Sequence, residues 1–226
     1  MISLKSLFFR QLKREGLLQI RDFRTAINAG LFFLMLIVFF PLTLPVNSNI
    51  LRIVAPGLIW VGVLLSLFLS SEKLFKQDYE DGIIEQWFVS PYPITIMVLA
   101  KISIHWLVNI IPVLLISPFM AILFKLSIYE IFIINISIIL GSPAIVALCA
   151  LSAGFSSGLK QKGVVMALIL LPLAIPILIL GSGSIMQGMH GEPVLGFLAL
   201  LLAISLTSLA LLPFAISGII KISLVD

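Results

Sequence analysis

The sequence predicts an all-α membrane protein with six transmembrane helices, and two observations support this prediction. First, its 226 residues are 61% hydrophobic and only 11% charged, with a mean hydropathy of +1.23. A soluble domain has no means of burying so much apolar surface. Second, the apolar residues form runs of about 20 or more, the length that a helix needs to cross a bilayer. We therefore expect residues 1–226 to form a single transmembrane domain.

Six apolar runs follow one another along the chain. They cover about residues 26–44, 53–70, 94–124, 128–155, 164–180 and 194–220. The third run exceeds the length of one straight span, and Pro112 and Pro118 within it predict a kinked or broken helix. Gly181-Ser182-Gly183-Ser184 predicts the end of the fifth span, followed by an outer loop that contains His190.

The N-terminal segment, residues 1–24, differs from the six spans. Its apolar residues Leu4, Leu7, Phe8 and Leu12 recur at helical spacing among lysine and arginine residues. This pattern is typical of an amphipathic helix that lies in the membrane interface and is attracted to anionic lipid. The segment has neither an apolar core nor a small-residue cleavage site, so we do not expect a cleavable signal peptide.

The distribution of lysine and arginine predicts which side of the membrane each loop occupies. With the N-terminus in the cytoplasm, the outer side receives only Arg52 and Lys125. The inner side receives the other basic residues, which are Lys5, Arg10, Lys13, Arg14, Arg21, Arg24, Lys73, Lys76, Lys101, Lys160, Lys162 and Lys221. This asymmetry agrees with the positive-inside rule and places both termini in the cytoplasm. Because the basic residues flank the spans and form no groove, we expect no nucleic-acid partner.

Half of the acidic residues lie in one short stretch between the second and third spans. They are Glu72, Asp78, Glu80, Asp81 and Glu85, against ten acidic residues in the chain. On a helical wheel, Asp78, Asp81 and Glu85 share one narrow face, and apolar residues occupy most of the opposite arc. The pattern predicts a short amphipathic helix at the cytosolic membrane surface. We interpret it as a docking element for a cytosolic partner.

The sequence offers few residues that could carry chemistry. It contains no G-x-x-x-x-G-K-[ST] motif, so the chain is not expected to bind ATP itself. It also lacks H-E-x-x-H, C-x-x-C and G-x-S-x-G motifs. Cys149 is the one cysteine, and we expect it to be a small buried residue in a helix interface. The sequence therefore predicts neither an enzyme nor a metal site.

Two histidines are candidate ligands. His105 lies within the third span, where an ionisable residue suggests a function by default, although a neutral histidine hydrogen-bonded to a neighbouring helix is the commoner case. His190 follows Met186 and Met189 in the predicted outer loop. Histidine and methionine are common haem ligands, although a solvated loop residue is the simpler interpretation of His190.

Several motifs together resemble the haem exporter protein B (CcmB) family. They are Ala55-Pro56-Gly57-Leu58-Ile59-Trp60 at the start of the second span, Leu74-Phe75, the pattern Asp78-x-x-Asp81-Gly82-x-x-Glu85-Gln86, and Ser90-Pro91. The resemblance extends over essentially the whole chain in length, number of spans and order of loops. Ile84 stands where a leucine would be usual, which is a mild departure.

The resemblance implies an ABC-2-like (type V exporter) permease fold in the bacterial inner membrane, acting as a homodimer. Its implied partners are a cytosolic ATPase subunit (CcmA-like), a haem-handling membrane subunit (CcmC-like) and a small membrane subunit (CcmD-like). ATP and magnesium would bind to the ATPase, and haem would be handled within the complex. ATP hydrolysis would release the haem-loaded periplasmic chaperone during c-type cytochrome biogenesis.

The resemblance also implies a coupling helix between spans two and three that enters a groove of the ATPase. Here that region is residues 72–91. The expected coupling residues are Phe75, Asp78, Asp81, Gly82, Glu85, Gln86 and Trp87. The two aromatic residues would be apolar anchors at the membrane or groove face, and the three acidic residues would pair with basic residues of the ATPase. Gly82 would permit a tight bend or a close backbone approach.

Three alternatives stay open. The chain could itself export haem or another small molecule. An intramembrane enzyme such as a lipid-modifying transferase would need several polar groups at one depth, and the spans offer only His105, Asn109, Asn135 and scattered serines. A channel or secondary transporter would usually carry carboxylates in mid-span, and we find none there.

Overall fold

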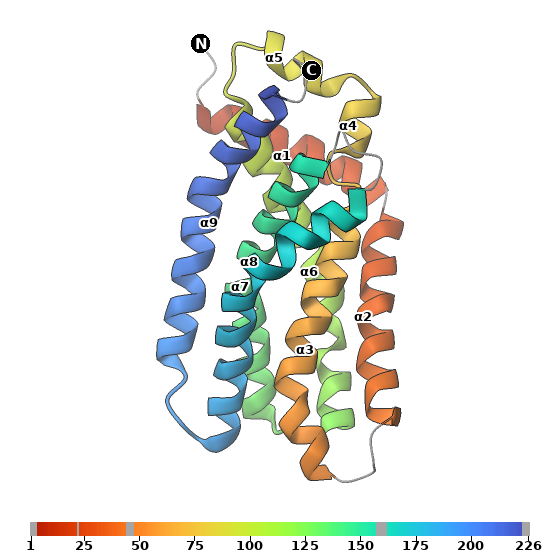
Figure 1. Cartoon of the computed structure of the whole chain (residues 1–226), viewed down its shortest axis with the longest axis vertical. Coiled ribbons are helices and arrows are strands. Elements are labelled where there is room, and N and C mark those ends of the chain that lie inside the picture. Colours follow the sequence, from red (N-terminus) through yellow and green to blue (C-terminus); the bar gives the residue numbers. More distant parts are fainter. Residues whose placement is uncertain (1–3, 22, 44–47, 157–161, 223–226) are drawn as a thin grey trace.

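The computed structural model describes residues 4–21, 23–43, 48–156 and 162–222, which form helices and no strand. The helices are α1 (Leu4–Arg21), α2 (Phe23–Thr43), α3 (Ser48–Ser71), α4 (Lys76–Glu80), α5 (Ile83–Val89), α6 (Ile94–Phe124), α7 (Ile128–Ser156), α8 (Lys162–His190) and α9 (Leu195–Ile222). Figure 1 shows them as one elongated bundle. The end predicted for the first span, residue 44, and the predicted inner-side Lys160 lie outside the described residues.

The six predicted spans are confirmed as helices long and apolar enough to cross a membrane: α2, α3, α6, α7, α8 and α9. The chain is therefore a multi-pass membrane protein. Of the kinked or broken helix predicted for the third span, the break is wrong, because α6 runs from Ile94 to Phe124 as one helix through Pro112 and Pro118, and the kink stays a prediction. Pro112 packs closely on Gly30 of α2, where an added Cβ would lie 2.7 Å from the proline Cβ. A neighbouring helix thus supports α6 at this proline.

The predicted end of the fifth span is also wrong, because α8 continues through Gly181 and Gly183 to His190. A Cβ at Gly181 would collide with the Trp60 indole of α3, and one at Gly183 would lie 2.5 Å from Phe197 of α9. The two glycines therefore admit large aromatic side chains from neighbouring helices and do not end the helix. α8 bends in its first half (Figure 1), where it carries Pro172 and Pro176.

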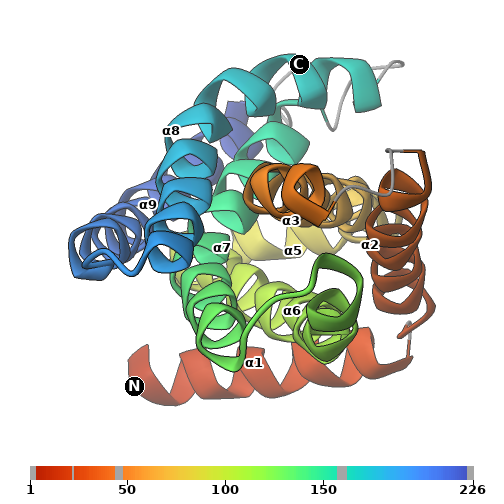
Figure 2. The same cartoon turned by 90° about the horizontal axis from the view of Figure 1, so that it is seen from below.

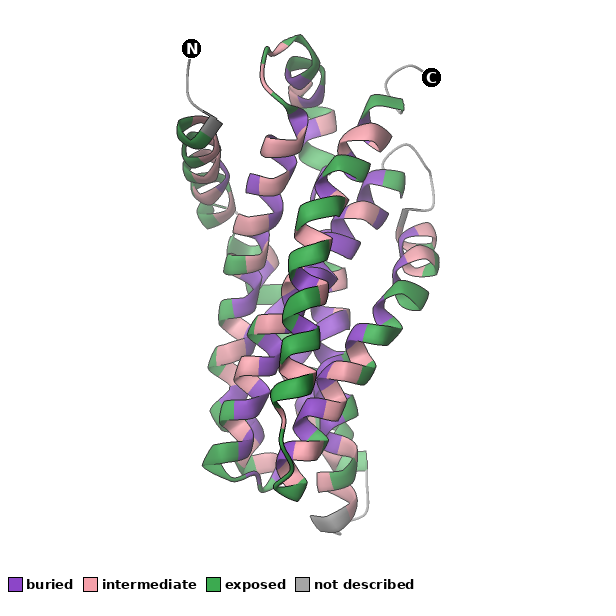
Figure 3. Ribbon diagram, turned by 90° about the vertical axis from the view of Figure 1, so that its left-hand side faces the viewer, coloured by how far each residue is buried: buried purple, intermediate pink, exposed green. Residues whose placement is uncertain are grey.

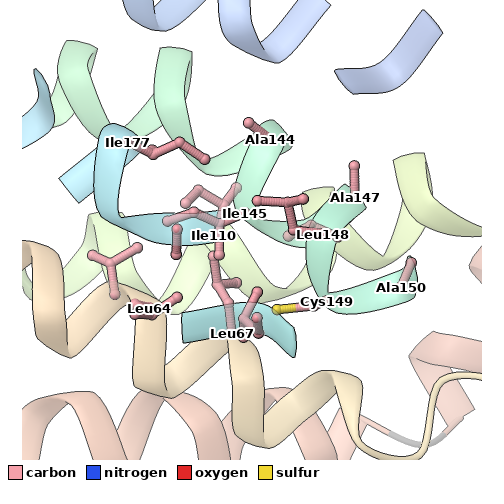
Figure 4. Close-up of a cluster of buried hydrophobic side chains, with 14 of the residues drawn as sticks. Leu64, Leu67, Ile110, Ala144, Ile145, Ala147, Leu148, Cys149, Ala150 and Ile177 are labelled. Carbon is pink, nitrogen blue, oxygen red and sulfur yellow. The ribbon is translucent and has the colours of Figure 1, made fainter. Parts of the chain in front are cut away.

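α7 occupies the centre of the bundle, packed against α3, α6, α8 and α9 (Figure 2). Its inward face meets Leu67 of α3, Ile110 of α6 and Ile177 of α8 in the buried cluster of Figure 4. Cys149 is fully buried in this cluster, as predicted. Close packing of this kind, and not escape from water, is what holds helices together inside a bilayer.

The outer faces of the bundle are apolar and exposed. Figure 3 shows buried residues along the interior of the bundle and exposed residues on its outside. α9 exposes Leu195, Leu206, Leu211 and Phe214, each by at least 60%. Such a surface suits contact with lipid or with other membrane subunits.

α1 lies across one end of the bundle and packs on α6 (Figures 1 and 2). α4 and α5 lie at the same end, which we call the α1 end. Its exposed apolar residues include Phe9, Leu17 and Ile20. That α1 lies in the membrane interface stays a prediction.

The turn between α6 and α7, at the opposite end, is held by a capping box. The Ser127 backbone N–H donates to Glu130 Oε2 over 2.7 Å, and the Glu130 N–H donates to Ser127 Oγ over 3.3 Å. Arg52 of α3 donates to the Lys125 carbonyl over 3.0 Å and forms an ion pair with Glu130. We call this arrangement the Arg52–Glu130 clamp. It ties the end of α3 to the α6–α7 turn.

Candidate functional site

The acidic stretch folds as two short helices and not as one. α4 ends where the Asp81 N–H donates to the Gln77 carbonyl and the Gly82 N–H donates to the Tyr79 carbonyl. Gly82 then adopts a φ of 66°, in the left-handed region that glycine enters without steric cost. The predicted bend at Gly82 is confirmed. The single helical wheel over Asp78–Glu85 is wrong, because this bend redirects every side chain that follows it.

The inward face of α5 and the residue that precedes α4 are apolar and buried in the chain's own core. Phe75 is 1% exposed, Ile84 is fully buried and Trp87 is 4% exposed. Phe75 and Trp87 were expected to be anchors facing the membrane or a partner's groove. The structure corrects this expectation, because both rings instead hold α4 and α5 against the spans of the same chain.

The outward face of this region carries the remaining polar residues. Asp81, Glu85 and Gln86 are exposed, as are Glu72 and Glu80. Glu80 pairs with Lys76 one turn earlier over 3.7 Å. Asp81 and Glu85 therefore present carboxylates to solvent at the α1 end, an arrangement that suits a basic protein surface.

Asp78 does not belong to this outward face. It is 3% exposed, and its Oδ2 lies 2.7 Å from Nζ of Lys101 in α6. The same Nζ donates to Oε2 of Glu15 in α1 over 3.0 Å. Glu15 Oε1 accepts further hydrogen bonds from Gln11 Nε2 at 3.1 Å and Arg14 Nη1 at 3.4 Å. We call Glu15, Asp78 and Lys101 the Lys101 network, and it corrects the expectation that Asp78 pairs with an ATPase.

The Lys101 network joins three elements that are distant in the sequence. Its side chains are 1% (Glu15), 4% (Asp78) and 8% (Lys101) exposed. A buried charge is stable only while an oppositely charged group lies beside it. Removing or displacing one partner therefore leaves the other charge buried and uncompensated. A displacement of α4 would therefore change the ion pairs that Lys101 of α6 forms with Asp78 and with Glu15 of α1.

His105 lies one turn beyond Lys101 and is a buried hydrogen-bond hub. The amide N–H groups of Gln19 and Asn109 each approach Nδ1 at 3.2 Å. The Ser71 hydroxyl lies 3.0 Å from Nε2 and the Ser70 hydroxyl 3.3 Å. This pattern fits a neutral ring that accepts at Nδ1 and donates from Nε2–H. His105 thus links α1, α3 and α6 structurally, and both ring nitrogens are engaged.

A polar cavity of about 130 Å³ lies between these two clusters. It is lined from α1 by Glu15 and Gln19, from α4 by Asp78, and from α6 by Lys101 and His105. Exposed Asp81 lies at the same cavity. The buried network is therefore adjacent to the outward acidic face.

His190 lies at the far end of the bundle from His105. It is exposed and forms the last residue of α8, so its predicted place in a loop is wrong. It lines a second cavity together with Met186, Met189 and Arg52. Within the described residues, no group of three His, Cys, Asp or Glu side chains could hold a metal ion.

Sequence reasoning missed Glu15 as a site residue and treated Lys101 only as a basic residue near the inner side. One signal was present: a lysine inside an apolar run requires a partner. Glu15 is also the one acid among the basic residues of α1. Neither signal could say which residues would pair.

The comparisons with known proteins agree on one family. The family model described as CcmB protein matches residues 5–223. Heme exporter protein B of Pseudomonas aeruginosa is 40% identical over 220 residues, which cover 97% of this chain and 99% of the relative. Heme exporter protein B of Haemophilus influenzae is 35% identical over 218 residues, covering 96% and 99%. The Escherichia coli K12 relative of the same name matches with 35% identity over 218 residues and the same coverage.

Proposed function

Because this chain belongs to the CcmB protein family, we propose that it is the transmembrane permease subunit of an ABC transporter complex for c-type cytochrome biogenesis. Its relatives are named heme exporter protein B, which supports a role in haem handling. The sequence has no phosphate-binding loop, so ATP hydrolysis belongs to a separate subunit. The permease itself is non-catalytic.

The proposed partners are a cytosolic CcmA-like ATPase, a CcmC-like haem-handling subunit and a small CcmD-like subunit. The exposed apolar faces of α8 and α9 suit contacts with membrane subunits or with a second copy in a homodimer. The α1 end carries most of the basic residues and faces the cytoplasm of a bacterial inner membrane. Haem is handled within the complex, and the work of ATP hydrolysis is the release of the haem-loaded periplasmic chaperone.

One observation carries this proposal. The α4–α5 region exposes Asp81 and Glu85 to solvent, whereas Asp78 points inward and pairs with Lys101 of α6. A partner that binds the outward carboxylates and shifts α4 would disturb the ion pair between Asp78 and Lys101. Lys101 lies in the first third of α6, a membrane-spanning helix. The Lys101 network thus connects the docking surface to the spans, which is what coupling requires.

Co-expression with the ATPase tests the proposal. We expect the double variant Asp81→Ala/Glu85→Ala to insert normally but to retain less ATPase when the tagged permease is purified in mild detergent. The matched control is Glu192→Ala, an exposed acid at the opposite end of the bundle. Equal ATPase retention in all three proteins would contradict docking at α4–α5.

A second variant separates docking from coupling. Glu15→Gln/Asp78→Asn/Lys101→Met neutralises the whole Lys101 network without touching the exposed carboxylates. We expect it to bind the ATPase like the wild type while ATP turnover and c-type cytochrome maturation fall. Normal maturation by this triple variant, stably inserted, would remove the coupling role from the Lys101 network.

The alternative in which the permease itself exports haem is supported only by the name of its relatives, heme exporter protein B. An intramembrane enzyme is not favoured, because His105, its chief candidate residue, is engaged at both ring nitrogens.

A further inference from the structure

The last turn of α8 brings together three side chains that the proposed function does not use. Met186, Met189 and His190 stand at positions i, i+3 and i+4 of the helix. This spacing places them on one helix face. All three line one cavity of about 370 Å³ at the end opposite α1. Met186 is 44% exposed and His190 is exposed, whereas Met189 is half-buried against the hydrophobic core, so an ion would reach the site past Met186 and His190.

We infer that this face of α8 is a binding site for Cu(I). Two thioether sulfurs and one imidazole nitrogen form a soft ligand set, and thioether ligands select Cu(I) among the biological metals. Harder ions such as Mg²⁺ and Ca²⁺ require several carboxylate or carbonyl oxygens. The described residues bring together no three His, Cys, Asp or Glu side chains that could serve such ions or a structural zinc.

The electrostatics of the site favour a cation. The three residues occupy the C-terminal turn of α8, where the helix dipole presents its negative end. The Gly188 and Gln187 carbonyls accept from Gly191 and Glu192 over 3.2 Å and 3.0 Å, so the turn is fixed in place. Arg52 also lines the cavity, but its guanidinium is paired with Glu130 and bonded to the Lys125 carbonyl. Its charge is therefore balanced and does not exclude an incoming cation.

The same geometry argues against a six-coordinate haem held by these residues. The two axial ligands of a haem iron approach from opposite faces of the porphyrin, and neighbours on one helix face cannot do this. They can converge on one small ion. The inference concerns a site distant from α4 and α5 and does not depend on the proposed function.

The test is a Cu(I) titration of the full-length protein in detergent, under anaerobic conditions, against a chromophoric Cu(I) chelator. We expect one Cu(I) per chain. The double variant Met186→Leu/Met189→Leu keeps the side-chain volume but removes both sulfurs, and it should raise the Kd by about tenfold or more. The matched control is Met35→Leu, because Met35 is an exposed methionine in α2. The control should bind Cu(I) like the wild type.

Two further measurements decide the remaining outcomes. X-ray absorption on the wild-type protein loaded with Cu(I) should show sulfur neighbours, and a shell of nitrogen and oxygen alone would overturn the inference. A hemin titration of the wild type and of His190→Ala tests whether haem, and not Cu(I), binds at this site. Hemin binding that depends on His190, together with a Cu(I) affinity unchanged in the Met186/Met189 variant, would assign the site to haem instead.

Discussion

Each end of the bundle holds a buried carboxylate that pairs with a base from another helix, but the two pairs are built differently. At one end, Glu130 pairs with Arg52, whose side chain is 39% exposed, and its carboxylate also caps α7. At the other end, Glu15 and Asp78 share Lys101, and all three side chains are at most 8% exposed. The clamp has one partly exposed partner and a local cap, whereas all three side chains of the Lys101 network are buried beside a polar cavity.

This difference sets how each end responds to a disturbance. If Arg52 moves away, Glu130 keeps the hydrogen bond from the Ser127 N–H. If α4 moves away from α6, Asp78 and Lys101 lose an ion pair over 2.7 Å between two buried side chains, and Asp78 forms no second ion pair within the described residues. The Arg52–Glu130 clamp keeps part of its support when Arg52 is displaced, which suits a turn with a fixed conformation. A pair that responds sharply to small displacements suits a connection between a docking surface and a span.

The largest expected effect comes from removing the shared cation. Lys101→Met leaves Glu15 and Asp78 buried without their cation, and we expect it to lower the free energy of unfolding by about 3–5 kcal/mol. Arg52→Met at the other end should cost less, about 1–3 kcal/mol, because only Arg52 is partly exposed and the buried carboxylate that it leaves still accepts from the Ser127 N–H. Thermal unfolding of the purified proteins in detergent, followed by tryptophan fluorescence, compares the two.

The neutralised triple variant Glu15→Gln/Asp78→Asn/Lys101→Met is the control for lost charge. It removes all three charges together, and most of the stability should return. If the triple variant is as unstable as Lys101→Met, lost packing and not an uncompensated charge explains the defect.

The second prediction concerns the hydrogen-bond hub beside the network. His105→Leu is close in volume but leaves the Gln19 and Asn109 amides without their shared acceptor. Gln19 is only partly buried, and Asn109 Nδ2 keeps its bond to the carbonyl of residue 105 over 2.8 Å, so the cost should be about 1–2 kcal/mol. The same unfolding assay measures the loss. A variant as stable as the wild type would mean that these amides find other partners.

The third prediction separates the two roles of Glu130. A glutamine can still accept the Ser127 N–H, so Glu130→Gln should lose only the ion pair with Arg52. Glu130→Ala also loses the cap and should be less stable than Glu130→Gln by about 1 kcal/mol. Equal stability of the two variants would show that the capping box contributes nothing beyond the ion pair.

The six spans could be predicted from the sequence because each depends on a local property, the length of an apolar run. The end of α8 could not, because glycine at positions 181 and 183 is explained by contacts with Trp60 and Phe197 from other helices. A glycine that ends a helix and a glycine that admits an aromatic ring look alike in one sequence.

The position of the candidate site in the chain could be predicted from the sequence, but the directions of its side chains could not. The acidic stretch and the bend at Gly82 follow from composition and from the conformational freedom of glycine. The inward direction of Phe75, Asp78 and Trp87 does not, because a helical wheel shows which residues share a face and not which part of the fold covers that face. The pairing of Glu15 with Lys101 joins residues 86 positions apart, so only the tertiary fold determines it.

The smallest effect on stability, and the sharpest contrast with Lys101, is expected from the exposed acids. Asp81→Asn/Glu85→Gln removes two charges that face solvent, so the unfolding temperature should match the wild type within error. Binding of the ATPase should weaken, and the remaining binding should depend less on salt, because attraction between exposed charges is screened. Glu192→Gln at the other end should change neither property. A lowered unfolding temperature would mean that these carboxylates support the fold of the loop and that α4–α5 has no separate docking face.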